Sequence, residues 1–180
     1  MITRSPGART RAAAIGAAAT LSGVVVAFSL PPQHLWFLAP VGLGGLAAIV
    51  ARQRARLRFG AGLLAGVGQF TIASIWAFQF TGWGYLVLVL FESLLVGIAC
   101  LLVGPSRGRL IGFAASITLL EAMRDTFPFG GVPLGGLALS QADGPLLGLA
   151  RLGGPYVVVA AAALAGSGLA LFGRVIVDAA

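Results

Sequence analysis

Six apolar stretches make up most of this chain, and short segments containing arginine, glycine or proline separate them. They cover residues 12–30, 35–50, 59–78, 83–103, 110–126 and 148–172. A helix that crosses the hydrocarbon core of a bilayer needs about 20 mostly apolar residues, with about 17 to 25 tolerated. The pattern therefore predicts an all-α, polytopic membrane bundle of about six transmembrane helices, with residues 12–180 forming one membrane domain behind a basic tail of residues 1–11.

The composition excludes an ordinary water-soluble domain. Only 9% of the 180 residues are charged, against about 25% in an average soluble domain, and 58% are hydrophobic. The formal net charge of +7 would suit nucleic acid if the basic residues shared one solvated face, but here they separate apolar runs. We therefore expect a membrane protein with no nucleic-acid partner.

The basic residues, all arginine, predict an orientation because positive residues are retained in cytoplasmic loops. With the N-terminus inside, only Arg124 and Arg151 fall on the outer side. The others fall on the cytoplasmic side: Arg4, Arg9, Arg11, Arg52, Arg54, Arg56, Arg58, Arg107, Arg109 and Arg174. We therefore expect a multi-pass protein with both termini in the cytoplasm.

Residues that usually carry catalysis are scarce. The chain has no lysine, its one cysteine (Cys100) lies in an apolar run without an adjacent base, and its one histidine (His34) lies in a loop. A packed thiol and a solvated imidazole are the simplest interpretations, and a two-histidine zinc motif is excluded. We expect no metal, no cofactor and no catalytic residue within these 180 residues.

One ionisable residue lies deep in a predicted span. Glu92 is midway along residues 83–103, where a charged carboxyl group costs a few kcal/mol unless it is protonated, paired or hydrated. Two interpretations stay open. Glu92 is either a functional group or a neutral glutamic acid that is hydrogen-bonded to a neighbouring helix through Gln69, Thr71 or Ser74.

Small residues predict where helices pack closely. The chain contains Gly62-x-x-x-Gly66 and Ala162-x-x-x-Gly166, spacings that allow two helix backbones to approach within lipid. In a chain so rich in glycine and alanine, packing within one subunit is favoured over a dedicated dimer face.

The segment from residue 121 to residue 145 combines charged, turn-forming and apolar residues. Glu121 and Arg124 are three positions apart, share a helix face and are expected to pair. The glycine- and proline-containing stretch that follows is apolar but unsuited to a straight helix. Non-helical backbone at membrane depth persists only when it is packed in protein or lines a cavity. We predict a broken or re-entrant segment at the outer face, with either a packing role or a lipid-access groove.

The same segment carries an ordered motif. Glu121-x-x-Arg124 is followed by Phe129-Gly130-Gly131-x-Pro133-x-Gly135-x-Leu137-Ala138-x-Ser140-Gln141-Ala142-Asp143-x-Pro145-Leu146. This motif resembles the membrane domain of apolipoprotein N-acyltransferase, particularly its actinobacterial branch. The resemblance extends through the turn at residues 30–36, Trp76 and Gly82-Trp83-Gly84, and it covers most of residues 12–172.

The resemblance implies transfer of an acyl chain from a phospholipid to a lipoprotein at the outer side of the bacterial cytoplasmic membrane. In that family the chemistry belongs to a nitrilase-like domain with a Glu-Lys-Cys triad, which a chain without lysine does not contain. We therefore expect a truncated membrane portion that is inactive alone. Its expected partners are membrane phospholipid and either a lipoprotein substrate or a separate catalytic polypeptide. The resemblance places a lipid or substrate groove at Glu121, Arg124, Gly131, Pro133, Ser140 and Gln141.

Two alternative functions remain. The resemblance also admits a non-catalytic membrane scaffold for a polyprenol-phosphate glycosyltransferase, with the arginine-rich face holding an acidic partner. A small transporter subunit that uses Glu92 is the other alternative, although transporters usually contain paired broken helices in two halves and this sequence shows one such segment.

Overall fold

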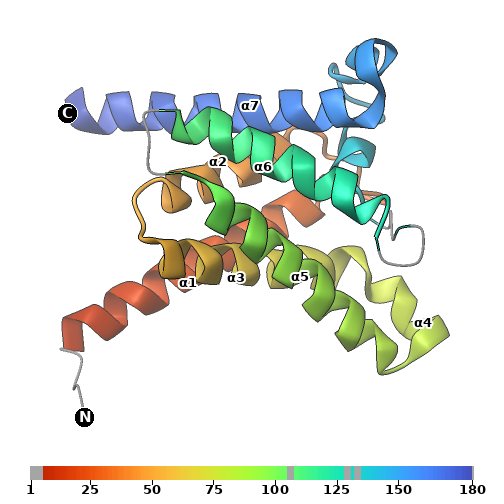
Figure 1. Ribbon diagram of the computed structural model, residues 1–180, viewed down its shortest axis with the longest axis horizontal. Helices are drawn as coiled ribbons and strands as arrows, with labels where there is room; N and C mark the ends of the chain where they lie inside the picture. The colour runs from red at the N-terminus through yellow and green to blue at the C-terminus, as the bar shows by residue number, and fades with distance from the viewer. Residues whose placement is uncertain (1–5, 105–107, 128–130, 132–134, 180) are drawn as a thin grey trace.

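The computed structural model describes residues 6–104, 108–127, 131 and 135–179, and its secondary structure there is entirely helical (Figure 1). The long helices are α1 (Pro6–Ala27), α2 (Leu38–Val50), α3 (Ala55–Ala73), α5 (Gly84–Leu102), α6 (Arg109–Arg124) and α7 (Ala150–Ala179). The short helices are η1 (Ile75–Ala77), α4 (Phe78–Thr81), η2 (Leu137–Gln141) and η3 (Leu147–Leu149). The predicted all-α fold is therefore confirmed over the described residues.

Three described helical segments are long and apolar enough to cross a bilayer: Thr10–Ala27, Gly84–Leu102 and Leu147–Ile176. Ala55–Ala73 and Ile75–Thr81 meet the same criterion together, but they are bent by 60° with respect to each other. The remaining long helices are shorter, with 13 residues in α2 and 16 in α6. The structure thus contains three candidate spans, or four if the bent pair counts as one.

Helices α1 and α3 differ from the predicted boundaries, and α7 contains a kink. Residues 1–11 were expected to form a tail, but α1 begins at Pro6, because proline suits the first turn of a helix and the following alanines favour helix. The helix expected over residues 59–78 ends at Ala73, where Ser74 leaves the α-helical conformation. The last helix is kinked beside Pro155, at Gly153 and Gly154, which have non-helical dihedral angles.

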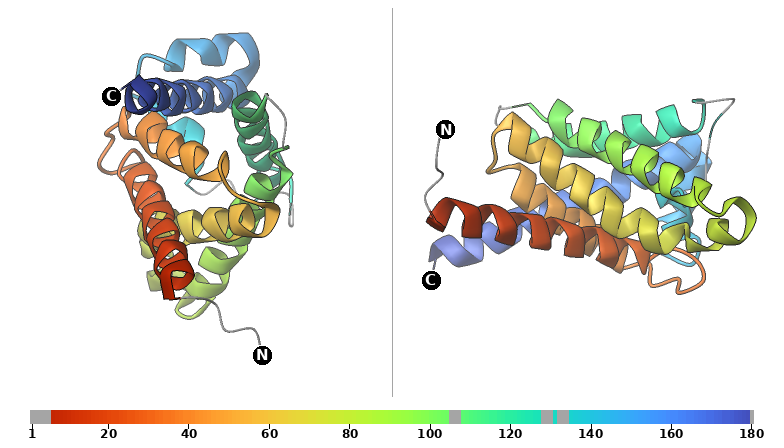
Figure 2. Two further views of the ribbon diagram at one scale, coloured as in Figure 1. Left: turned by 90° about the vertical axis from the view of Figure 1, so that its left-hand side faces the viewer. Right: turned by 90° about the horizontal axis from the view of Figure 1, so that it is seen from below.

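The bundle has two distinct ends (Figures 1 and 2). At one end lie the loop of residues 28–37, α4 and the segment of residues 135–149; we call this the loop end. At the other lie the start of α1, the turn between α2 and α3, and the end of α7; we call this the terminal end. The long helices run between these two ends.

Glycine allows α3 to pack closely against α5. A Cβ placed at Gly62 would lie 2.7 Å from the carbonyl oxygen of Val96 and 2.8 Å from Cys100 Sγ, and one at Gly66 would lie 2.5 Å from Ser93 Cα. The Cys100 thiol is free and fully buried in this contact. The Gly62-x-x-x-Gly66 motif therefore packs helices within one subunit, as predicted.

The second small-residue motif joins α7 to α2. A Cβ placed at Gly166 would lie 2.6 Å from the carbonyl oxygen of Pro40 and 2.8 Å from the backbone nitrogen of Gly44. Ala162, one turn earlier on α7, is 1% exposed. In lipid, such backbone proximity supplies the dispersion energy that hydrophobic burial supplies in water.

Gly66→Ala is expected to destabilise the bundle, because the added methyl group has backbone rather than a mobile side chain in its way. We expect the free energy of unfolding to fall by about 1 to 3 kcal/mol, measured by thermal unfolding in detergent. The matched control is Gly60→Ala on the same helix, where a Cβ would meet nothing within 4 Å. Equal loss of stability in both variants would contradict the close packing of α3 on α5.

Candidate functional site at the loop end

Three buried side chains, Glu92, Glu121 and Arg124, form what we call the charge cluster. Arg124 Nε lies 2.5 Å from Glu92 Oε2, and Arg124 Nη1 lies 3.2 Å from Glu121 Oε1. The exposed fractions are 1% for Glu92, 4% for Glu121 and 1% for Arg124. A guanidinium group from the end of α6 therefore bridges a carboxylate on its own helix and one on α5.

The charge cluster also contacts two further parts of the fold. The Arg124 guanidinium carbon lies 4.9 Å from the centre of the Phe70 ring on α3, within the range of a cation–π interaction. Glu121 Oε1 accepts a hydrogen bond of 2.9 Å from the backbone N–H of Leu137. The cluster thus holds α3, α5, α6 and the start of η2 together.

The outcome for the predicted charged residues is mixed. The pair between Glu121 and Arg124 is present as the i, i+3 spacing predicts. Of the two interpretations of Glu92, the one that joins it to Gln69, Thr71 or Ser74 names the wrong partner, because Glu92 pairs with Arg124 of α6. The hydropathy of the sequence placed Glu92 in the middle of an apolar helix, but hydropathy carries no information on which neighbouring helix a side chain faces.

Backbone and side-chain contacts fix the segment of residues 135–149 over the loop end. Gln141 is fully buried, and its Nε2 donates to the carbonyl oxygen of Trp36 at 3.0 Å and to Ser140 Oγ at 3.2 Å. His34 Nδ1 lies 3.0 Å from Asp143 Oδ2 at the surface. Together with the bond from Leu137 to Glu121, these contacts make the segment a fixed layer, which we call the outer platform.

Sequence reasoning missed the two contacts between the platform and the loop of residues 28–37. His34 was expected to be simply solvated; its side chain is 41% exposed, but it pairs with Asp143. Gln141 was assigned to a groove, and the structure instead directs its amide to the backbone of Trp36. The sequence held one clue to these contacts: each joins a residue of the turn at residues 30–36 to a residue of the motif at residues 121–146, and both stretches carry the family resemblance.

Four of the predicted groove residues, Glu121, Arg124, Ser140 and Gln141, are buried, and Gly131 is half-buried. Ser140 is 2% exposed, and Gly131 has a φ of 109° and lies so close to Asp125 that an added Cβ would be 2.2 Å from its carbonyl oxygen. Pro133 lies outside the described residues. The cavity beside the charge cluster, lined in part by Gln69 and Phe70, has a volume of about 20 Å³, which is room for about one water molecule. This cavity is too small for an acyl chain.

The comparisons with known proteins agree with the resemblance in the sequence. Residues 22–168 match the sequence model of the apolipoprotein N-acyltransferase N-terminal domain. The apolipoprotein N-acyltransferase of Ralstonia nicotianae (strain ATCC BAA-1114 / GMI1000) is 36% identical over 183 aligned residues, which cover 89% of this chain and 34% of the relative. The chain therefore spans about a third of the length of this curated relative.

Arg124→Ala is expected to destabilise the fold strongly, because two buried carboxylates lose their counterion. Removing one partner of a buried ion pair typically costs about 3 to 5 kcal/mol, which thermal unfolding in detergent will detect. The control is Arg151→Ala, which removes the same charge from an exposed position on α7 and is expected to cost less than about 1 kcal/mol.

Glu92→Gln is expected to be much milder than Arg124→Ala. It leaves Glu121 and Arg124 as a balanced pair and keeps the size of the side chain, so we expect a loss below about 2 kcal/mol by the same measurement. A Glu92→Gln variant as unstable as Arg124→Ala would show that the two-carboxylate arrangement, rather than charge balance around Arg124, stabilises the bundle.

Proposed function

Because this chain belongs to the apolipoprotein N-acyltransferase family, we propose that it forms the membrane-embedded part of a system that transfers an acyl chain from phospholipid to lipoprotein. The match covers residues 22–168 and corresponds to the N-terminal domain of the family. An all-helical fold with apolar helices long enough to cross a bilayer suits that role. The scaffold and transporter alternatives are not favoured.

In this proposal the catalytic groups come from a nitrilase-like domain outside these 180 residues. Acyl transfer through a thioester needs an activated thiolate and a base. This sequence contains no lysine, and its one thiol, Cys100, is fully buried between α3 and α5. In this proposal the membrane portion therefore binds and positions the phospholipid and the lipoprotein, and it performs no covalent step of its own.

The observation that carries the proposal is the attachment of the outer platform to the charge cluster. Glu121 accepts the Leu137 N–H, and Gln141 and Asp143 bind the loop of residues 28–37. We infer that this layer seats the phospholipid donor and the lipoprotein substrate at its exposed rim, beside the catalytic domain. In this proposal Glu121 and Arg124 hold the platform, and Ser140 and Gln141 are part of it. Gly131 and Pro133 belong to the stretch of sequence that precedes it.

We further propose six spans in the bacterial cytoplasmic membrane, with both termini in the cytoplasm and the loop end outside. The alternation of α1, α2, α3, α5, α6 and α7 between the two ends supports this topology (Figure 1), as does the distribution of arginines. For α2 and α6, local adjustment of the bilayer to short helices costs fractions of a kcal/mol per Å.

Reporter fusions test this topology. We expect fusions after Gly82 and after Gly144 to report an outer location, and fusions after Arg56 and after Arg174 to report a cytoplasmic one. Each position is fused to two reporters in turn, one active only outside the membrane and one active only in the cytoplasm. Every position then gives a positive signal with one of the two. Any position on the wrong side would overturn the six-span arrangement.

Complementation of a strain depleted of apolipoprotein N-acyltransferase tests the activity. We expect the 180-residue chain alone to give no growth. We expect growth from a chimera in which the chain replaces the matching membrane segment of the Ralstonia nicotianae relative, since that relative is 36% identical and supplies the missing catalytic groups.

The chimera also tests whether acylation requires the intact charge cluster. Arg151→Gln is the control for Arg124→Gln, and membrane levels of both chimeras are compared by immunoblot. The proposal expects loss of lipoprotein N-acylation with Arg124→Gln and normal acylation with Arg151→Gln. Growth supported by the chain alone, or failure of a well-expressed unmodified chimera, would contradict the proposed role.

A further inference from the structure

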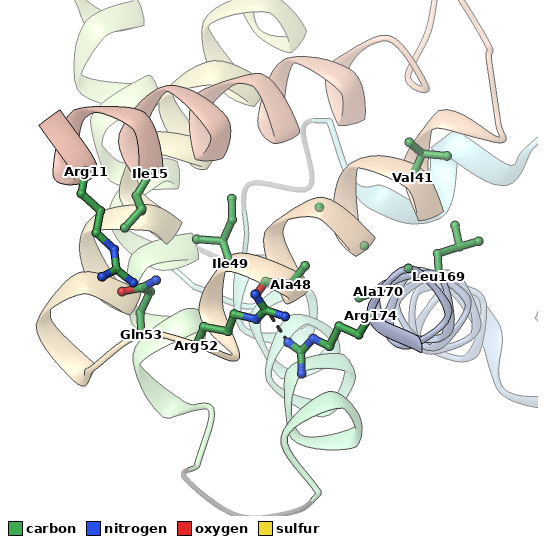
Figure 3. Close-up of a pocket in the computed structure, with 13 residues that line it drawn as sticks. Arg11, Ile15, Val41, Ala48, Ile49, Arg52, Gln53, Leu169, Ala170 and Arg174 are labelled. Carbon is green, nitrogen blue, oxygen red and sulfur yellow. Dashed lines mark hydrogen bonds between the residues drawn. The ribbon is translucent and has the colours of Figure 1, made fainter. Parts of the chain in front are cut away.

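A large pocket lies at the terminal end, between α1, α2 and α7 (Figure 3). Its volume is about 600 Å³, within the range of about 300 to 1,000 Å³ that is usual for ligand pockets. It is separate from the charge cluster, which is built where α6 ends near the outer platform (Figure 1). We call it the arginine pocket, after Arg11, Arg52 and Arg174 in its lining.

The arginine pocket is amphipathic along its length. Its apolar part follows α2 from Val41 to Ile49, with Leu169 and Ala170 of α7 as the facing wall. Eight residues of helix correspond to about 12 Å. Figure 3 shows the Arg52 and Arg174 side chains close together and Arg11 beside Gln53, with Val41 and Leu169 on the side away from Arg11. The basic and apolar parts of the pocket therefore suit a ligand with an anionic head and an apolar tail.

The charges of the pocket are unbalanced. Among the residues that the structure describes, its lining contains three arginines and no acidic residue, and none of the three makes an ion pair with a described carboxylate. Figure 3 shows Arg52 and Arg174 extending toward one another from opposite walls. Arg174 Nη2 donates to the carbonyl oxygen of Ala48 at 3.5 Å, while its buried Nε has no hydrogen-bond partner. An anion between these guanidinium groups would remove their repulsion.

We propose that the arginine pocket binds one molecule of an anionic phospholipid. The guanidinium groups of Arg52 and Arg174, with Arg11 nearby, bind the headgroup phosphate, for which their planar donors are well suited. One acyl chain lies along α2 toward Val41 and Leu169. Basic pockets between membrane helices on the cytoplasmic side are typical binding places for anionic headgroups. A free phosphate would satisfy the arginines but would leave the apolar length empty, so the pocket favours a lipid.

This lipid is distinct from the acyl donor of the proposed function, because it lies at the opposite end of the bundle. Its place between α1, α2 and α7 lets it hold the first and last long helices against α2 where α1 begins and α7 ends. The binding test below uses the purified chain and needs no acyl-transfer activity, so its outcome is independent of the complementation experiment.

Native mass spectrometry and thermal unfolding in a non-ionic detergent test the proposal directly. The purified chain is titrated in parallel with dioleoyl-phosphatidylglycerol, dioleoyl-phosphatidylcholine, glycerol 3-phosphate and inorganic phosphate. We expect one bound phosphatidylglycerol and a raised unfolding midpoint. Phosphatidylcholine should bind at least about tenfold more weakly, because its head is zwitterionic. Stabilisation by inorganic phosphate equal to that by phosphatidylglycerol would overturn the lipid assignment.

Charge-matched variants locate the headgroup. Arg52→Gln/Arg174→Gln is expected to weaken phosphatidylglycerol binding about tenfold or more. The control, Arg54→Gln/Arg56→Gln, removes the same charge from exposed arginines that do not line the pocket, and it should bind nearly as the unmodified chain does. Equal weakening in the two double variants would mean diffuse attraction to the basic end and would overturn a defined site.

Matched glycine variants test whether the lipid occupies the pocket. Gly173 lines the pocket and Gly168 does not, and a Cβ at either position meets nothing within 4 Å. Gly173→Leu is therefore expected to reduce phosphatidylglycerol binding several-fold, and Gly168→Leu is expected to leave this binding unchanged. Without lipid, both variants should unfold at a midpoint near or above that of the unmodified chain, because leucine favours helix more than glycine does. Unchanged binding in Gly173→Leu would place the lipid outside the pocket.

Discussion

The fold depends on a buried positive charge that must be neutralised within the protein. Arg124 is 1% exposed, so bulk water does not reach its guanidinium group to replace a lost counterion. Its two carboxylate partners come from α5 and α6, and the Phe70 ring of α3 covers it. One side chain thereby restricts the relative position of three helices. Because Glu121 also binds the Leu137 N–H, the same charge sets where the irregular outer platform begins.

Close helix packing makes that electrostatic arrangement geometrically attainable. Gly62 and Gly66 bring the backbone of α3 against α5, which carries Glu92, and Gly166 brings α7 against α2. Lipid provides little hydrophobic drive for helix association, so the small residues and the charge cluster stabilise the bundle in different ways. Glycine contacts supply dispersion energy through proximity, and the ion pairs select which helix faces meet.

The two ends of the bundle carry different chemistry. At the loop end the buried charges of Glu92, Glu121 and Arg124 are paired, the cavity is close to the size of one water molecule, and hydrogen bonds fix the platform. At the terminal end a pocket of about 600 Å³ contains arginines without acidic partners in its lining. In the proposed role, where the loop end faces a catalytic domain, the bundle would gain from a firm attachment at its opposite end. Binding of anionic lipid at the terminal end would provide that attachment.

The sequence by itself determined the features that depend on local spacing or on composition. The all-helical fold follows from the apolar stretches, the Glu121–Arg124 pair from a three-residue spacing, and the family from the ordered motif of residues 121–146. Only the tertiary structure decided that Arg124 pairs with Glu92, that Gln141 binds the backbone of Trp36, 105 positions away, and that Arg11, Arg52 and Arg174 meet in one pocket. Hydropathy places a residue along a helix, but it does not specify the rotation of that helix about its axis or its neighbours. Contacts between distant side chains depend on both.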